Sequence, residues 1–233
     1  MENQKPILEL ELYLIRHGQS MGNKGYGRDD ITLREAADPV LTDLGKAQAE
    51  ALGRFYSGTN FDAVYSSGLM RAAETATELL KYQSSFKPLN ILPLLTEVGL
   101  TPDYEGLNIN QIKETINPNA VVAEGFDSEK LLLCYNQGSD EEGLYQRAKA
   151  TVDYIRKKYK KGEKVALVSH AAFLTYVIFY LMEFRKNPAF DVSVFNTGVT
   201  KINFYTEGTN KYGDTVFDYL NSTTHLLGLE TSN

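Results

Sequence analysis

A chain of 233 residues with 42% hydrophobic and 23% charged side chains is long enough to bury the core of one generous domain, and its composition is that of an ordinary globular protein. The formal net charge of −6 argues against a nucleic-acid binder, which normally presents a basic field, so no nucleic-acid partner is expected. The single cysteine, Cys134, excludes an intramolecular disulfide and a cysteine-rich zinc site, and its apolar neighbours indicate a buried thiol.

The sequence carries no signal for export or membrane insertion. The N-terminal residues lack the positively charged segment and apolar core of a signal peptide. The most apolar stretch, residues 171–182, is only about half as long as a helix that spans a bilayer. We therefore expect a cytoplasmic protein with no membrane partner.

The first predicted element is a buried strand over residues 7–15, which runs directly into Arg16, His17 and Gly18. The stretch is short, rich in large apolar residues and closed by a turn signal, which favours a strand over a helix. Ligands of open α/β sheets bind beyond the carboxyl ends of the strands, so Arg16 and His17 occupy a position typical of functional residues. A lone histidine after a strand is more often structural, so this motif alone leaves both interpretations open.

Residues 21–40 are rich in glycine and aspartate and are expected to form a loop. Thr42 is a predicted N-cap, and the apolar spacing over residues 44–55 predicts the helix that follows. A short strand at residues 61–65 leads to a second helix that carries Arg71 in its first turn. The free N–H groups and dipole of a helix N-terminus favour an anion, and an arginine adds a planar fork that fits phosphate.

A third strand is predicted at residues 89–95, and it ends at Thr96 and Glu97. Periodicity fades over residues 98–138, which we interpret as a lid or cap insertion with one or two short helices. Tyr104, Phe126 and Tyr135 in this insertion either stack on a substrate or form the core of the lid.

The rest of the chain returns to alternating elements. An amphipathic helix over residues 144–159 precedes a strand at residues 165–168, which ends at His170. The apolar helix after it must be buried on all sides. Residues 192–205 are predicted to form a hairpin at a sheet edge, which offers a surface for a possible homodimer, and residues 215–220 are predicted to add a last strand. This alternation predicts an α/β sandwich.

The chain has three histidines, and two of them, His17 and His170, follow apolar strands. The carboxyl ends of parallel strands open onto one face, so the two histidines, Arg16 and Arg71 would form an anion pocket in an acidic protein. A phosphoryl group fits guanidinium forks best. A neutral imidazole can attack phosphorus, and Glu97 would protonate the leaving oxygen and later accept a proton from water. Fixed cations would make a metal unnecessary.

Three motifs in chain order resemble those of the histidine phosphatase (phosphoglycerate mutase-like) superfamily. They are LIRHGQS at residues 14–20, YSSGLMRAAETA at residues 65–76 and VSH at residues 168–170. Weaker matches are Asn23, residues 41–49, residues 104–106 and residues 221–226.

The resemblance implies a single domain over residues 1–233 with a three-layer sandwich, a mostly parallel central sheet flanked by helices, and a cap-like insertion at about residues 98–138. It also implies that neither metal nor cofactor is needed. His17 would be the phosphorylated nucleophile and Glu97 the proton donor. The implied phosphate-binding residues are Arg16, Asn23, Arg71 and His170. His225 falls in the tail motif and is expected to be a structural or rim residue.

This chain departs from the family pattern in two places. Ala171 and Ala172 follow His170 where a glycine pair is usual, and the spacing from Glu97 to Glu105 is about one residue longer than the common pattern. The chain also lacks tryptophan, and with it the tryptophan-containing segment of the cofactor-dependent mutases. We therefore expect a phosphomonoester hydrolase acting on a small phosphorylated metabolite. The alternatives are a cofactor-dependent phosphoglycerate mutase and a non-catalytic phospholigand sensor.

Overall fold

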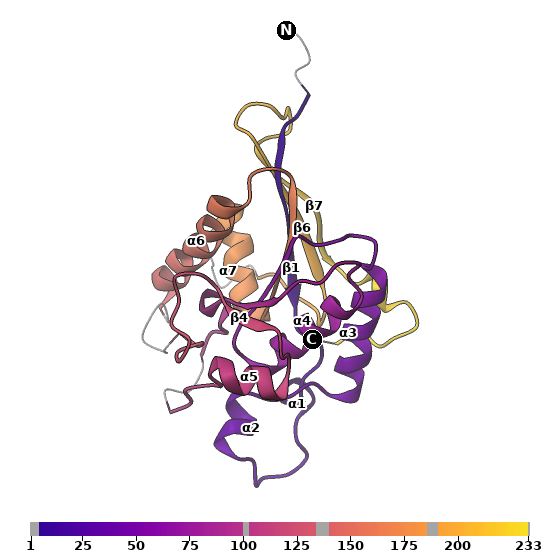
Figure 1. The fold of residues 1–233 in the computed structure, drawn as a ribbon, viewed down its shortest axis with the longest axis vertical. Helices are drawn as coiled ribbons and strands as arrows, with labels where there is room; N and C mark the ends of the chain where they lie inside the picture. The colour runs from indigo at the N-terminus through magenta and orange to yellow at the C-terminus, as the bar shows by residue number, and fades with distance from the viewer. Residues whose placement is uncertain (1–4, 100–102, 134–139, 186–190, 233) are drawn as a thin grey trace.

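The computed structural model describes residues 5–99, 103–133, 140–185 and 191–232, so Cys134 and Tyr135 lie outside the described residues. Seven strands in these ranges form one sheet in the order β4-β3-β2-β5-β1-β6-β7 (Figure 1). The strands are β1 Leu8–Arg16, β2 Ala63–Ser66, β3 Leu89–Ile91, β4 Ala120–Val122, β5 Glu163–Ser169, β6 Val199–Tyr205 and β7 Thr215–Ser222. The α-helices are α1 Met21–Lys24, α2 Leu33–Ala37, α3 Asp43–Phe55, α4 Met70–Lys81, α5 Ile109–Thr115, α6 Glu141–Lys158 and α7 Ala171–Leu181. Two 3₁₀ helices are η1 Pro93–Leu95 and η2 Thr224–Leu226.

The sheet is mostly parallel, because only β6 runs against its neighbours β1 and β7. Strands β1 and β5 lie side by side in parallel register, with Arg16 opposite Ser169. This register places His17 and His170, the next residue of each chain segment, at the same edge of the sheet.

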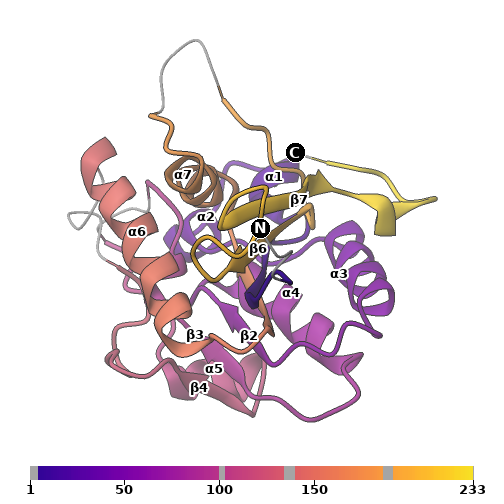
Figure 2. The same cartoon turned by 90° about the horizontal axis from the view of Figure 1, so that it is seen from above.

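Helices cover both faces of the sheet, which makes three layers (Figure 2). Alternate side chains of β1 explain the two cores, since successive residues of a strand point to opposite faces. Leu10, Leu12 and Leu14 pack in the core that includes α6 and α7. Tyr13 and Ile15 pack in the core that includes α3 and α4. The predicted α/β sandwich is therefore confirmed.

Several local predictions agree with the structure. Thr42 caps α3, and its hydroxyl accepts a hydrogen bond from the Gly45 N–H at 3.0 Å. Helix α7 is buried along most of its length, as its uniformly apolar sequence requires. None of the helices in the described ranges combines the length and apolar character needed to cross a membrane.

Other predictions were wrong in detail. Residues 21–40 contain the short helices α1 and α2 rather than loop alone. The strand predicted at residues 89–95 stops at Ile91, and Pro93 opens the 3₁₀ turn η1, because proline cannot donate to a sheet ladder.

The predicted hairpin at residues 192–205 is a single strand, β6, whose antiparallel partners are β1 and β7. The exposed edge on this side of the sheet is therefore β7. Within the insertion predicted at residues 98–138, β4 pairs with β3 and extends the central sheet, so part of the insertion belongs to the sandwich itself.

Candidate active site

The strand ends bring two buried histidines together. His17 follows β1 and is 3% exposed, while His170 follows β5 and is fully buried. Their ring centroids lie 5.1 Å apart. The backbone joins the two strand ends as well, because the His17 N–H donates to the Ser169 carbonyl at 2.9 Å. The expectation that the two histidines share one face is confirmed by this geometry.

Hydrogen bonds fix the tautomer of His17. Its Nδ1 lies 2.7 Å from the Gly18 carbonyl oxygen, which can only accept, so Nδ1 carries the proton. The Arg71 Nε–H donates to His17 Nε2 at 3.2 Å, so Nε2 presents a lone pair. Burial lowers the pKa of His17 well below 6.5, and the positive charges of Arg71 and Arg16 lower it further. His17 is therefore a neutral imidazole with a nucleophilic Nε2.

The two arginines carry buried positive charge that the protein leaves incompletely paired. Arg16 donates from Nη1 to the Val194 carbonyl, and its Nε has no hydrogen-bond partner among the described residues. Arg71 Nη1 also lacks a hydrogen bond there, and it lies 3.7 Å from Asp38 Oδ1. Burial lowers the pKa of both guanidinium groups, that of Arg16 to about 10, yet both stay charged at neutral pH. Unpaired buried N–H groups favour an anionic ligand.

His170 has one occupied and one free ring nitrogen. Its Nε2 lies 2.7 Å from the Ser67 hydroxyl, whereas its buried Nδ1 has no partner in the described part of the chain. When the Ser67 hydroxyl donates to Nε2, the proton of the neutral ring lies on Nδ1 and is available to an anion. Burial and the neighbouring Arg71 lower the pKa of His170 well below 6.5, so the ring is neutral.

Glu97 lies half-buried beside this group, at the N-terminus of α7. Its Oε1 accepts hydrogen bonds from the Val98 N–H at 2.8 Å and the Phe173 N–H at 3.1 Å. Burial raises the pKa of the Glu97 carboxyl, although these N–H groups and Arg71 partly oppose that shift. A raised pKa suits a carboxyl group that must give up a proton near neutral pH.

A cavity of about 280 Å³ is lined by the predicted residues Arg16, His17, Asn23, Arg71 and Glu97, whereas the fully buried His170 lies beside His17 and is not one of its lining residues. Asn23 lies on its exposed rim. The Asn23 Oδ1 accepts from the Ser20 N–H at 3.1 Å and the Ser20 hydroxyl at 3.0 Å. The side-chain oxygen of Asn23 therefore caps α1, which leaves any phosphate contact to its amide nitrogen.

Close backbone contacts explain two glycines near the site. A Cβ on Gly18 would lie 2.5 Å from the Gly45 carbonyl oxygen, and a Cβ on Gly45 would lie 2.0 Å from the Gln19 carbonyl oxygen. The loop after β1 therefore packs directly on the first turn of α3, and this contact restrains the backbone next to His17.

Three aromatic residues were predicted either to stack on a substrate or to form lid core. Phe126 packs against the core beside α6, with its ring 5.8 Å from that of Tyr154. The Tyr104 hydroxyl donates to the buried Asp38 carboxylate at 2.9 Å, and Tyr135 lies outside the described residues. Phe126 is thus core, and Tyr104 joins the insertion to the segment that carries Asp38.

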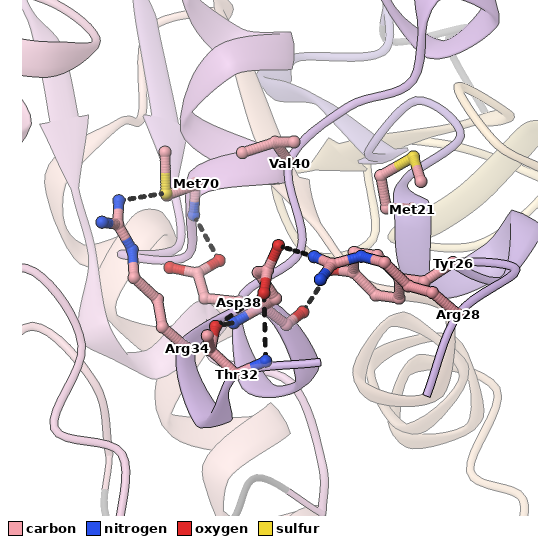
Figure 3. A pocket seen from close by; sticks show the side chains of 9 residues that line it. Met21, Tyr26, Arg28, Thr32, Arg34, Asp38, Val40 and Met70 are labelled. Atoms are coloured by element: carbon pink, nitrogen blue, oxygen red, sulfur yellow. Dashed lines mark hydrogen bonds and ion pairs between the residues drawn. The ribbon is translucent and has the colours of Figure 1, made fainter. Parts of the chain in front are cut away.

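Residues 36–40 also border a second pocket, of about 590 Å³, whose lining side chains Figure 3 shows. Ala36, Ala37 and Pro39 line the cavity at His17, whereas Asp38 and Val40 line the second pocket. The segment is therefore part of the wall between them. In the second pocket the side chain of Arg34 reaches the Met70 sulfur at 3.3 Å, and Arg28 pairs with Glu35 (Figure 3).

Sequence reasoning missed several residues that hold the site. Ser67 stands inside the second quoted motif, and its buried contact with His170 could have been suspected from that position. Asp38 stands in a stretch predicted as loop and gave no signal. Arg147 occupies the buried stripe of α6 together with Leu144 and Ala148, and a charged residue at such a position is a recognisable signal. Among the described residues, no group of three or more His, Cys, Asp or Glu side chains is arranged to hold a metal ion.

The strand ends of this α/β sandwich thus bring together two histidines, two arginines and a carboxyl group, and sequence comparison identifies the family. The sequence model of the histidine phosphatase superfamily (branch 1) matches residues 12–213. The chain therefore belongs to the histidine phosphatase superfamily, as its motifs predict.

Two curated relatives are phosphatases. Fructose-2,6-bisphosphatase TIGAR of Xenopus laevis is 31% identical over 104 residues, which cover 44% of this chain and 36% of the relative. This match spans only about a third of that relative's length. Broad-specificity phosphatase YOR283W of Saccharomyces cerevisiae is 27% identical over 203 residues, which cover 84% of this chain and 80% of the relative.

Solved structures confirm the fold. Phosphoserine phosphatase from Entamoeba histolytica, in complex with 3-phosphoglyceric acid, is 26% identical with a TM-score of 0.59, and the match covers 93% of this chain and 99% of that one. Phosphoglycerate mutase from Bacillus anthracis is 25% identical with a TM-score of 0.59 over 97% of both chains. The proteins similar to this chain thus include phosphatases as well as a phosphoglycerate mutase.

Proposed function

We propose that this protein hydrolyses small phosphomonoesters through a phosphohistidine formed on His17, without a metal ion. The observation that carries the proposal is the arrangement around His17 Nε2. Its lone pair accepts a hydrogen bond from Arg71 Nε at 3.2 Å. The side chains of Arg16 and Arg71 line the same cavity, and each has a buried N–H group without a partner among the described residues. Such a set binds the three equatorial oxygens of a phosphoryl group while the imidazole attacks.

In the first step, the hydrogen bond of the Arg71 Nε–H moves from His17 Nε2 to a phosphoryl oxygen of the substrate. The freed Nε2 lone pair forms a bond to phosphorus as the bond from phosphorus to the ester oxygen breaks. The leaving oxygen takes the proton of the Glu97 carboxyl, which its raised pKa keeps available. Arg16, Arg71 and His170 hold the phosphoryl oxygens throughout.

In the second step, water attacks phosphorus and gives its proton to the Glu97 carboxylate. The bond from phosphorus to Nε2 breaks, so His17 returns to its neutral form and inorganic phosphate leaves. Fixed guanidinium charges stabilise the transferring group in both steps, so the scheme requires neither a metal ion nor another cofactor.

The test is hydrolysis of p-nitrophenyl phosphate in EDTA, with acid-labile phosphate trapped on the protein. We expect turnover in EDTA for the parent, and loss of both turnover and trapped phosphate for His17→Ala. Arg156→Met is the control, because Arg156 lies on α6 and does not line the cavity. Turnover that EDTA abolishes, or that survives in His17→Ala, would refute the scheme.

A mutase is the second candidate, supported by the likeness to the Bacillus anthracis phosphoglycerate mutase. The same phosphohistidine would then pass its phosphoryl group to a hydroxyl of the substrate rather than to water. Isomerisation of phosphoglycerate that depends on 2,3-bisphosphoglycerate, with little release of phosphate, would favour it. Normal binding of phosphate esters by His17→Ala, with no turnover by the parent, would indicate a non-catalytic sensor instead.

We further propose that residues 1–233 form one domain and that residues 98–138 shape the leaving-group side of the pocket. Val98 and Gly99 line the cavity, and Tyr104 contacts its wall through Asp38, which supports this role. Exchange of the segment for that of a relative is expected to change the ranking of substrates, and an unchanged ranking would refute the role.

The proposed setting is cytoplasmic, without a nucleic-acid partner, and a homodimer would form by pairing at the exposed strand β7. The mass in solution, measured by light scattering, tests the dimer, and an added proline in β7 is expected to dissociate it. A monomeric mass for the parent protein would refute the pairing.

A further inference from the structure

Helix α6 buries a cation on its apolar side. Arg147 is only 7% exposed and lies on the stripe formed by Leu144, Ala148 and Val152. Burial of a charge is costly unless polar partners compensate. No carboxylate in the described part of the chain lies within ion-pair distance of Arg147, and its buried Nε has no hydrogen-bond partner there. A charge retained under these conditions calls for an explanation.

Both contacts of Arg147 are with residues that adjoin Glu97, one along the chain and one through a hydrogen bond. Its Nη1 donates to the carbonyl oxygen of Thr96 at 2.7 Å. Its guanidinium lies over the ring of Phe173, 4.1 Å from the centroid. Thr96 directly precedes Glu97, and the Phe173 N–H donates to Glu97 Oε1 at 3.1 Å. One rigid fork therefore holds both the backbone that carries Glu97 and the residue that binds its carboxylate.

Arg147 also interacts electrostatically with Glu97. Burial lowers the pKa of Arg147 to about 10, and Glu97 is the group that opposes this shift. The guanidinium thus remains charged at neutral pH and senses Glu97 although the two form no ion pair.

We infer that Arg147 is a positioning residue that fixes the Glu97 carboxyl for proton transfer to the leaving group, an inference that rests on the proposed function. A proton donor must lie within hydrogen-bond reach of the leaving oxygen, and a misplacement of about 1 Å can cost on the order of 100-fold in rate. The planar fork suits this task because it holds the residue that ends η1 and helix α7 at once.

The test is the dependence of kcat/KM on the leaving group, across a series from p-nitrophenyl phosphate to glycerol 2-phosphate. A good leaving group needs no proton, whereas an alkoxide does. Glu97→Gln is expected to lower kcat/KM for glycerol 2-phosphate by roughly 100-fold or more and to change p-nitrophenyl phosphate far less. Arg147→Met and Arg147→Lys should show the same steepened dependence, with a loss of roughly 10- to 100-fold on the alkyl ester.

Arg156→Met is the matched control. Arg156 lies on the same helix and also stacks on an aromatic ring, that of Phe204 at 4.7 Å, but its carboxylate partner is Glu9. We expect it to keep the parent dependence. Phe173→Leu is a second test, because it removes the ring under the guanidinium and keeps the backbone N–H that binds Glu97. Inhibition by inorganic phosphate should change by less than about 3-fold in these variants, since Arg16 and Arg71 are untouched.

The outcomes separate the two proposals. A parent-like dependence in Glu97→Gln would refute the role of Glu97 and the inference with it. A steep dependence in Glu97→Gln but not in the Arg147 and Phe173 variants would overturn the inference and leave the proposed function intact. An equal loss on all substrates would assign Arg147 a purely structural role, which also overturns it.

Discussion

His225 makes the stability of this protein sensitive to acid. Its Nε2 lies 2.9 Å from the Thr197 hydroxyl, which itself donates to the Asn196 carbonyl at 2.8 Å. The imidazole is therefore the donor, and it is neutral. Thr197 has a positive φ of 53°, and its N–H reaches the carbonyl oxygens of Arg16 and His17 at 3.1 and 3.2 Å. The contact thus supports the backbone at the candidate nucleophile.

The magnitude follows from the lowered pKa. Burial lowers the pKa of His225 from 6.5 to about 4, so the unfolded chain takes up the proton first. Stability is then lost as the pH falls from about 6.5 towards 4 and levels off below. At about 1.4 kcal/mol for each pKa unit, the titration of His225 lowers the free energy of unfolding by about 2.5 kcal/mol between pH 7 and pH 4.5.

The assay is urea unfolding, followed by circular dichroism, of the parent and His225→Gln from pH 7 to pH 4.5. Glutamine can still donate to Thr197 but does not titrate. Over this range the free energy of unfolding of the variant should therefore fall by about 2.5 kcal/mol less than that of the parent. His17 and His170 have lowered pKa values as well, and their contribution cancels in the difference. Parallel curves, within about 0.5 kcal/mol, would refute the argument from burial.

Two further substitutions test the packing and the tautomer. Gly45→Ala places a Cβ 2.0 Å from the Gln19 carbonyl oxygen and should lower the free energy of unfolding by about 1–3 kcal/mol, measured in urea. Gly58→Ala is the control, because open space surrounds Gly58, and it should change the free energy of unfolding by less than about 0.5 kcal/mol. Equal stability of the two variants would contradict the close contact. Ser67→Ala removes the partner of His170 Nε2 and should weaken inhibition by inorganic phosphate roughly 10-fold, and an unchanged inhibition constant would show that Ser67 does not set the tautomer.

The sequence determined most of the longer elements and the chemistry of the strand ends, because both depend on local pattern. The apolar stretch before Arg16 and His17 could only be a short buried strand, and Thr42 could be identified as a cap from its neighbours alone. The placement of His17 beside His170 followed from one general rule, that parallel strands open onto the same edge. Strand β4 could not be predicted in this way, because its three residues are too few to show a hydrophobic periodicity.

Only the tertiary structure decided which partners complete the site. Ser67 and His170 are 103 residues apart, and Arg147 and Thr96 are 51 apart, so no local pattern links them. The same holds for β6, whose place between β1 and β7 depends on strand pairing across most of the chain. Local sequence fixes the backbone preference and the hydrophobic face of each element, whereas hydrogen-bond partners and buried charges depend on which faces meet when those elements pack.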